Sequence, residues 1–467
     1  MRKGGGSVIS LFDNASYLVL IMAHASTLKP TLTPLLLWGL GVGYVVSGMY
    51  FGWNLGLEQG GTLGLGTATM AAILMYTAFS FSYSELACAI PRAGGALDYA
   101  SRAFGSEVGF ITGLAQVIEF VFAPPAIAIA IGTYGHSAYA PIDIHIAAVS
   151  VYVLFTAVNI FGVRAAATFE LIITVLAVGE LIIFAGVTLP HFSMAQFTHD
   201  PLPHGWAGAF AALPFAIWFF LGIEGVANVA EETLHPQRDI TRGFGWAILT
   251  LVLLCVLTFL ACVGVAGWNA VVYNPDHSTS DAPLLLAMGQ VIPATHWLYR
   301  LLISIGLFGL IASFHGLILA SGRATFEMGR VGYMPRWLGH VHSRYATPAT
   351  ALIANALVGI IAIYTGHTAA IITLSVFGAL TLYILAMCAL IRLRNIEPQM
   401  ERPFRVPLYP FTPILALVIA SLSMLAMIWY NGTLAAIYFG IVLVGYVLYR
   451  SLVKQKRPKT SILQDNE

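Results

Sequence analysis

The chain has 467 residues, of which 58% are hydrophobic and only 9% are charged. Soluble globular domains carry about 25% charged residues, so this composition excludes a water-soluble fold and indicates that lipid surrounds most of the surface. The formal net charge of +1, with basic residues clustered only at 454–459, gives no support for nucleic-acid binding. We therefore expect an integral membrane protein.

Twelve apolar runs come close to the roughly 20 residues that a helix needs to cross a bilayer. Residues 1–33 precede these runs and contain only a short, interrupted apolar stretch, so we expect them to form a cytoplasmic segment. A short helix outside the membrane is expected at 282–290. The predicted spans are 34–57, 61–90, 107–137, 143–163, 166–189, 208–232, 243–268, 296–329, 348–366, 368–394, 409–430 and 432–453.

Basic residues are distributed unequally between the two sides of these spans. If both termini are cytoplasmic, Arg300 is the sole external residue among the 22 Lys and Arg. Cytoplasmic loops of membrane proteins carry an excess of Lys and Arg. The distribution therefore predicts a multi-pass protein of the cell membrane, with cytoplasmic termini and an even number of spans.

Glycines interrupt two of the predicted helices. The span 34–57 contains six glycines, and the span 208–232 contains Gly222 and Gly225 on either side of Glu224. Broken helices at corresponding places in two halves indicate an inverted-repeat transporter whose site lies near the bilayer midplane. We expect an all-α fold with a five-plus-five repeat over 34–394, two further helices over 395–453 and a cytoplasmic tail, 454–467.

Three glutamates lie at membrane depth, namely Glu119, Glu180 and Glu224, and no Lys or Arg occupies the centre of any predicted span. Placing one charge there costs about 2.5–3.5 kcal/mol on insertion scales. Acids without basic partners indicate an imported cation, protonated carboxyl groups, or both. Each glutamate can instead hydrogen-bond a neighbouring helix in its protonated form, without touching a substrate.

Other acids lie closer to the helix ends, where interfacial ion pairs or gate contacts are expected. These acids are Glu85, Glu170, Glu231, Glu232 and Glu327, and their candidate partners are Arg92, Arg164 and Arg323.

Aromatic residues flank both glycine-interrupted segments. An ammonium group over an aromatic face gains about 0.5–2 kcal/mol, although 12% of the chain is aromatic and packing alone accounts for many rings. The predicted substrate-binding residues are Ser47, Gly48, Tyr50, Trp53, Glu119, Glu180, Phe219, Phe220, Gly222 and Glu224. Glu224, Glu180 and His315 are the predicted proton-coupling residues, because a buried glutamate can exchange a proton for a cationic amine and histidine titrates near neutral pH.

Four signatures resemble the amino acid–polyamine–organocation (APC) superfamily of transporters. The first is the glutamate-containing break at 222–225 with Glu231-Glu232 and a Pro/Arg turn after it. The others are SEL with AIPRAGG over 84–95, ASGR with GRVGYMP over 320–335, and Thr347-Pro348. Within the superfamily, SGMYFGW at 47–53 and FAPP at 122–125 resemble the ethanolamine permeases. The resemblance implies helices 1 and 6 that unwind at their middles, and secondary transport by alternating access.

Two departures from the superfamily pattern bear on the substrate. In its amino-acid carriers, helix 1 breaks at Gly-Ser/Ala-Gly, and the exposed amides there hold the substrate carboxylate. Val46 stands here in place of the first glycine, before Ser47-Gly48, which favours a substrate without a carboxylate. Several proton-coupled relatives carry a lysine in helix 5, where this chain has Ala177.

The leading hypothesis is a secondary transporter that imports a small cationic amine, most simply ethanolamine, by proton-coupled symport. An amino-acid permease or exchanger is the alternative within transport, and an amine-gated channel or membrane receptor is the alternative of another class. The sequence shows no catalytic triad, Walker motif or metal-ligand cluster. We therefore predict no enzymatic activity, cofactor or metal.

Overall fold

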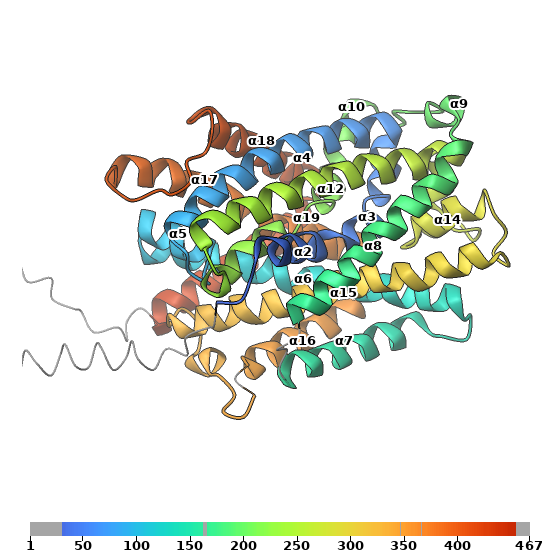
Figure 1. Cartoon of the computed structure of the whole chain (residues 1–467). Coiled ribbons are helices and arrows are strands. Elements are labelled where there is room, and N and C mark those ends of the chain that lie inside the picture. The colour runs from blue at the N-terminus through green and yellow to red at the C-terminus, as the bar shows by residue number, and fades with distance from the viewer. Residues whose placement is uncertain (1–29, 162–165, 346, 366, 454–467) are drawn as a thin grey trace, which may run out of the picture.

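The computed structural model describes residues 30–161, 166–345, 347–365 and 367–453. These residues form a bundle of helices without a β-sheet, and two isolated bridges are the only strand-like pairings among them (Figure 1). Ten of the described helices are long and apolar enough to cross a membrane, and two shorter apolar helices, 34–50 and 349–363, complete the set. The all-α prediction is confirmed, and the helix set is consistent with twelve spans.

The helices follow the predicted order. The first half contains α2 (Pro34–Val45), α3 (Ser47–Tyr50), α4 (Leu55–Ala89), α5 (Ala96–Phe104), α6 (Ser106–Ala138), α7 (Ile144–Phe161), α8 (Ala166–Thr188), η1 (Leu189–His191) and α9 (Met194–Phe197). The helices that follow are α10 (Gly205–Ala211), α11 (Leu213–Trp218), η2 (Ile223–Glu232), α12 (Pro236–Ala266), α13 (Asn269–Val272), α14 (Pro283–Gly289), α15 (Trp297–Arg330), η3 (Arg336–Gly339), α16 (Ala349–Ile363), α17 (Thr368–Ile396), α18 (Phe411–Tyr430), α19 (Gly432–Leu448) and η4 (Tyr449–Val453). The short helix expected at 282–290 is present as α14.

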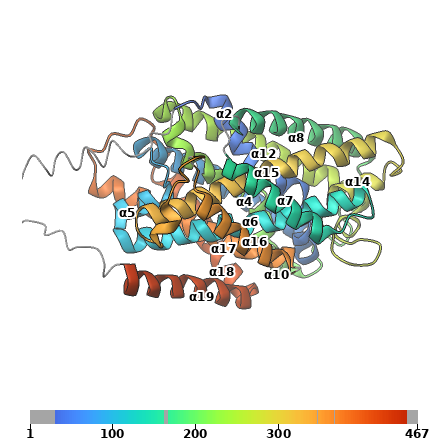
Figure 2. The ribbon, with the colours of Figure 1, turned by 90° about the horizontal axis from the view of Figure 1, so that it is seen from below.

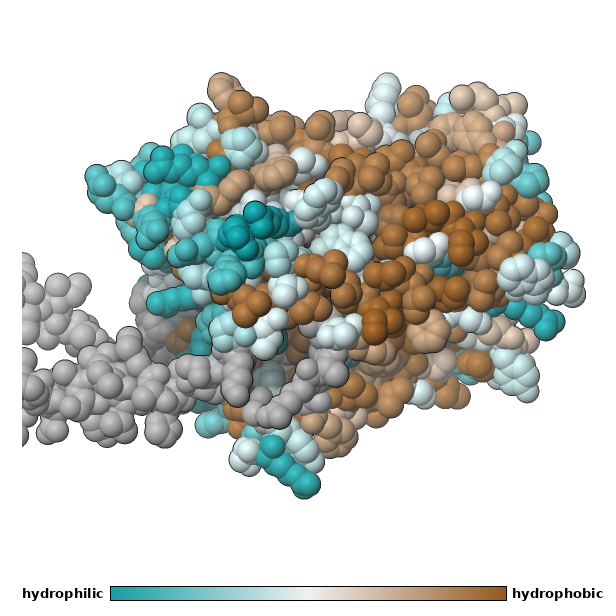
Figure 3. All heavy atoms as spheres, viewed as in Figure 1, coloured by the Kyte–Doolittle hydropathy of each residue, from teal (hydrophilic) through white to brown (hydrophobic). Residues whose placement is uncertain are grey.

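The surface has the polarity of a membrane protein. A hydrophobic band occupies the middle of the molecule, and hydrophilic side chains gather mainly at the end that contains α5 (Figure 3). Large apolar side chains are exposed to the surroundings; Trp429 of α18, for example, is 83% exposed. Such exposure is unfavourable in water and expected against lipid.

Burial divides the helices into a centre and a periphery. The most apolar stretch of α6 is 94% buried and that of 213–232 is fully buried, whereas α19 is mostly exposed and lies at the edge of the bundle in Figure 2. A helix that is apolar all round and buried all round belongs to the core of the bundle. The segments with the predicted acids Glu119 and Glu224 are therefore the innermost ones.

Both predicted helix breaks are present. Helix 1 is interrupted between α2 and α3, and its backbone turns again at Gly52, where φ is +86°. Helix 6 is interrupted after α11 by Gly222, with φ of +101°, a conformation that glycine adopts without the steric cost of a side chain. It continues as the 3₁₀ helix η2.

Candidate substrate and proton site

Glu119 of α6 and Glu224 at the start of η2 meet in the centre of the bundle. Both side chains are fully buried, and their carboxyl groups lie within hydrogen-bonding reach of each other. Among the described residues, neither forms an ion pair with Lys, Arg or His. The structure therefore brings two of the three predicted midplane acids into one unneutralised pair.

A chain of tyrosines supports this acid pair from two other helices. The hydroxyl of Tyr383 in α17 donates to Oε2 of Glu224 over 2.9 Å, and it lies 3.1 Å from the hydroxyl of Tyr76 in α4. Ser375 of α17 donates to the backbone carbonyl of Glu119 over 2.7 Å. Since buried polar groups need partners, these bonds fix α17 and α4 against the acids.

Aromatic rings cover the site next to helix 6. Phe220 lies 5.2 Å from the ring of Tyr76, so it belongs to the wall around Glu224. Trp53 stacks on Phe219 with centroids 5.4 Å apart, and both side chains are fully buried. The predicted aromatic residues thus form two neighbouring groups, of which Phe220 is the one that contacts the tyrosine chain.

The break in helix 1 has a specific cause. The amide of Ser47 donates to the hydroxyl of Ser313 in α15 over 2.9 Å, and that hydroxyl donates to the carbonyl of Gly43 over 2.6 Å. In a regular helix the amide of residue 47 would bond directly to the carbonyl of residue 43. The Ser313 side chain is inserted into this bond, a recognised cause of kinks.

The helix 1 break is closed against helix 6 in this conformation. A Cβ atom on Gly48 would lie 2.6 Å from the carbonyl oxygen of Trp218, so no larger residue fits there without movement. Because the Ser47 amide is already bonded to Ser313, it is not free to hold a carboxylate here.

Glu180 does not join the central acid pair. Its carboxyl group accepts a hydrogen bond from Tyr50 and, beside Gly306 of α15, approaches the ring edge of Tyr134. Tyr134 follows Glu119 by 15 residues in the same helix, α6, which corresponds to roughly 22 Å along its axis. Tyr50 and Glu180 therefore form a second polar site, distant from Glu119.

The partner of His315 is Glu170, an acid that the sequence analysis grouped with those near the helix ends. Nδ1 of His315 lies 3.4 Å from Oε2 of Glu170, and both side chains are almost completely buried. The other carboxyl oxygen of Glu170 has no hydrogen-bond donor among the described residues, and it lies 2.5 Å from the position of a Cβ on Gly43. Glu170 was predicted in an interfacial ion pair or gate contact; the structure buries it between α8 and helix 1, and its partner is His315 in place of an arginine.

The remaining acids near the helix ends form contacts at the end of the bundle that contains α5. Glu232 pairs with Arg323 over 2.7 Å, as the sequence suggested, whereas Glu85 pairs with Arg394 and Arg402. Arg164 lies outside the described residues. The other pairings are Glu327 with Arg330 and Glu231 with the backbone amide of Ala93.

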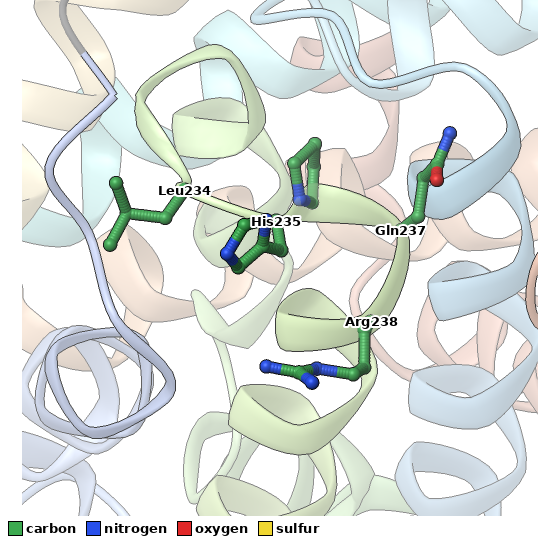
Figure 4. Close-up of a pocket in the computed structure, with 5 residues that line it drawn as sticks. Leu234, His235, Gln237 and Arg238 are labelled. Atoms are coloured by element: carbon green, nitrogen blue, oxygen red, sulfur yellow. The ribbon is translucent and has the colours of Figure 1, made fainter.

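Sequence reasoning did not single out Tyr76, Tyr383 or Ser313. Each is a polar side chain within an apolar span, but the chain contains 20 tyrosines, so this signal alone does not separate a site residue from a packing residue. A surface hollow is lined by Leu234, His235, Pro236, Gln237 and Arg238 in the turn after η2 (Figure 4). It lies apart from the buried acids and contains none of the predicted site residues.

The chain is similar in sequence to known transport proteins over most of its length. The family described as amino acid permease matches residues 19–450. An uncharacterised transporter of Rhizobium meliloti (strain 1021) is 29% identical, over 86% of this chain and 87% of its own length. Two proteins of Bacillus subtilis (strain 168) are each 25% identical: a branched-chain amino acid permease, over 94% of this chain and 97% of its own, and a methylthioribose transporter, over 84% and 87%.

Proposed function

The chain belongs to the amino acid permease family, and on this basis we propose that it transports a small cationic amine, with ethanolamine as the first candidate. Transport proceeds by alternating access and is coupled to protons. Membership of the family makes the protein a membrane transporter with a small-molecule substrate. The cationic nature of the substrate and the coupling to protons are inferred from the geometry of the candidate site.

The observation that carries the proposal is the contact between Glu119 and Glu224. Two buried carboxyl groups without a basic partner form a site of negative charge at the break of helix 6. A primary ammonium group has three N–H donors and one positive charge, which match the unsatisfied oxygens of this pair. The rings of Phe220 and Tyr76 beside the pair add aromatic faces for the cation.

The break in helix 1 supports a substrate without a carboxylate. The hydroxyl of Ser313 accepts the hydrogen bond of the Ser47 amide, and Gly48 is packed against the carbonyl of Trp218. The side chain of Val46 is fully buried in the same turn. An amino-acid substrate would need an anion site there, whereas an amino alcohol would not.

Uptake of radiolabelled ethanolamine into liposomes that contain the purified protein tests the proposal. We expect saturable uptake that responds to a pH gradient, and a decrease of about tenfold or more in Glu119→Gln and in Glu224→Gln, because hydrogen bonds to charged groups contribute about 1.5–3 kcal/mol. Glu58→Gln is the matched control, since Glu58 accepts from Tyr273 away from the pair. Normal transport by Glu119→Gln, Glu224→Gln and Glu180→Gln alike would contradict the proposal.

An amino-acid substrate is the second candidate, because one relative is named a branched-chain amino acid permease. Competition separates the two candidates. An excess of leucine or alanine should leave ethanolamine uptake unchanged if the site takes amines without a carboxylate. Strong inhibition by either amino acid, or its uptake in place of ethanolamine, would favour the second candidate.

A further inference from the structure

We infer that a proton and the substrate ammonium compete for the Glu119–Glu224 pair, so that the protein exchanges amines for protons in opposite directions. This inference rests on the proposed function and adds the direction of coupling. In symport, the hypothesis drawn from the sequence, the proton and the amine would move together and need separate sites.

First, the pair has few hydrogen-bond donors around it. Both carboxyl oxygens of Glu119 and Oε1 of Glu224 are buried and receive no hydrogen bond from an N–H or from a hydroxyl of the described residues. Oε2 of Glu224 accepts from the hydroxyl of Tyr383, and the backbone amides of Gly222 and Glu224 also act on this carboxyl group. An ionised carboxylate can only accept, so two carboxylates in contact can bond to each other only through a proton.

The second step is electrostatic. Two carboxyl groups in contact cannot both remain ionised in a buried site without a cation, as in other acid dyads that share one proton. In this closed conformation the two carboxyl groups lie within hydrogen-bonding reach of each other. The pair therefore holds one proton here and carries a net charge of −1.

The third step concerns the other titratable groups that face the pair. They are tyrosines from four neighbouring helices: Tyr44 of α2, whose ring lies against Gly225, Tyr76 and Tyr83 of α4, Tyr383 of α17 and Tyr438 of α19. Neutral tyrosines neither supply nor remove a charge near neutral pH. His315 of α15, which also packs against α6, is paired with Glu170. The shared proton is therefore the exchangeable charge of this pair.

The exchange balances in atoms and charge. An R–NH₃⁺ group that enters between the acids donates its N–H bonds to both carboxylates, and the shared proton leaves as H⁺. The pair then has two negative charges and one bound positive charge, so its net charge is again −1. One amine thus crosses for one proton in the opposite direction, and the complete cycle moves no net charge.

Liposomes with imposed gradients test this coupling. With the wild-type protein, an acidic lumen should drive ethanolamine accumulation, changing the steady-state ratio by about tenfold for each unit of pH difference. An external acidic medium should drive efflux, and a potassium–valinomycin potential should have no effect. Protein-free liposomes correct for passive diffusion of the neutral amine.

Three results would overturn the inference or its basis, and they are distinguishable. Accumulation driven by acid outside means symport, and accumulation driven by a negative potential alone means uniport; either outcome overturns exchange but keeps the amine substrate. An absence of saturable amine uptake under every gradient contradicts the proposed function, and exchange with it. In the double variant Glu119→Gln/Glu224→Gln, residual transport should lose its response to the pH gradient, whereas Glu58→Gln should keep it.

Discussion

At the residue scale, Ser313 shows how one hydroxyl group can shape a broken helix. It accepts from the Ser47 amide and donates to the Gly43 carbonyl, so it takes both groups that a regular helix would join to each other. Helix 1 therefore opens because of a side chain from α15, and the glycines only permit the opening. The same hydroxyl links α15 to the segment that borders the candidate site.

Substitution of this residue tests its role. Ser313→Ala should lower the rate of amine uptake by about tenfold, because it removes two buried hydrogen bonds of about 0.5–1.5 kcal/mol each and lets helix 1 close over its break. Ser321→Ala is the control, since Ser321 bonds only to the carbonyl of Ile318 in its own helix. Equal uptake rates for the two variants in liposomes would contradict this account.

At the scale of the helices, two groups of contacts hold the bundle together at its ends. Glu85 of α4, whose side chain is 1% exposed, binds Arg394 of α17 through two hydrogen bonds of 2.8 and 2.6 Å. It also accepts from the Val406 amide in the loop after α17. At the other end, Asp281 accepts a hydrogen bond from Thr368 at the start of α17.

Removing Arg394 should destabilise the fold much more than removing an exposed arginine. Arg394→Ala leaves the buried Glu85 charge with weaker compensation and should cost about 3 kcal/mol. Arg102→Ala breaks the exposed pair with Glu397 and should cost about 0–1 kcal/mol. Thermal unfolding of both variants in detergent measures the difference. Similar melting temperatures would show that the Glu85–Arg394 contact stabilises the fold no more than the exposed Arg102–Glu397 pair.

The external loop should respond to pH through Asp281. Burial raises the pKa of Asp281 to about 6, against the opposing effect of the Thr368 hydrogen bond. The folded-state pKa lies above that of an exposed aspartate, so as the pH falls Asp281 is protonated in the folded protein at a higher pH than in the unfolded chain. The free energy of unfolding should therefore increase as the pH is lowered from about 6 to about 4.

Asp281→Asn should remove this part of the pH dependence, which thermal unfolding across the same range would detect. An unchanged pH profile in the variant would mean that Asp281 titrates equally in both states. Asp276→Asn is a suitable control, because the pKa of Asp276 is lowered by its hydrogen bonds to Ser278.

At the scale of the whole molecule, charge and hydrophobicity follow the same axis. The hydrophilic side chains lie mainly at the end with α5, and the apolar band surrounds the buried acids (Figure 3). The described basic residues lie on the predicted cytoplasmic side, with Arg300 as the exception. The positive-inside rule therefore predicts that the end with α5 faces the cytoplasm.

Cysteine labelling tests this orientation. In a background without the four native cysteines, Arg300→Cys should react with a membrane-impermeant maleimide on intact cells, and Arg336→Cys should react only after permeabilisation. Both positions are exposed, so their reactivity depends on which side they face. The reverse pattern would place the termini outside and would contradict the predicted orientation.

Much of the fold follows from the sequence, since lipid imposes strict rules on a spanning segment. Every backbone polar group must be satisfied within the helix, so length and apolarity alone predicted the α-helical class and the position of the spans. The glycines at 222–225 marked the break in helix 6, and the acids were recognisable because carboxyl groups are rare at that depth.

Which acids meet was decided only by the tertiary structure. The sequence gives the depth of a residue in the membrane but not the helix face that meets another helix, so it favoured Glu224 at the helix 6 break but did not show which other acid it meets. Packing joined Glu119 to Glu224 across 105 positions of the chain, paired Glu180 with Tyr50, and buried Glu170 beside His315. The physical reason is that a span's own sequence determines its helical state, whereas its neighbours are determined by side-chain complementarity summed over the whole bundle.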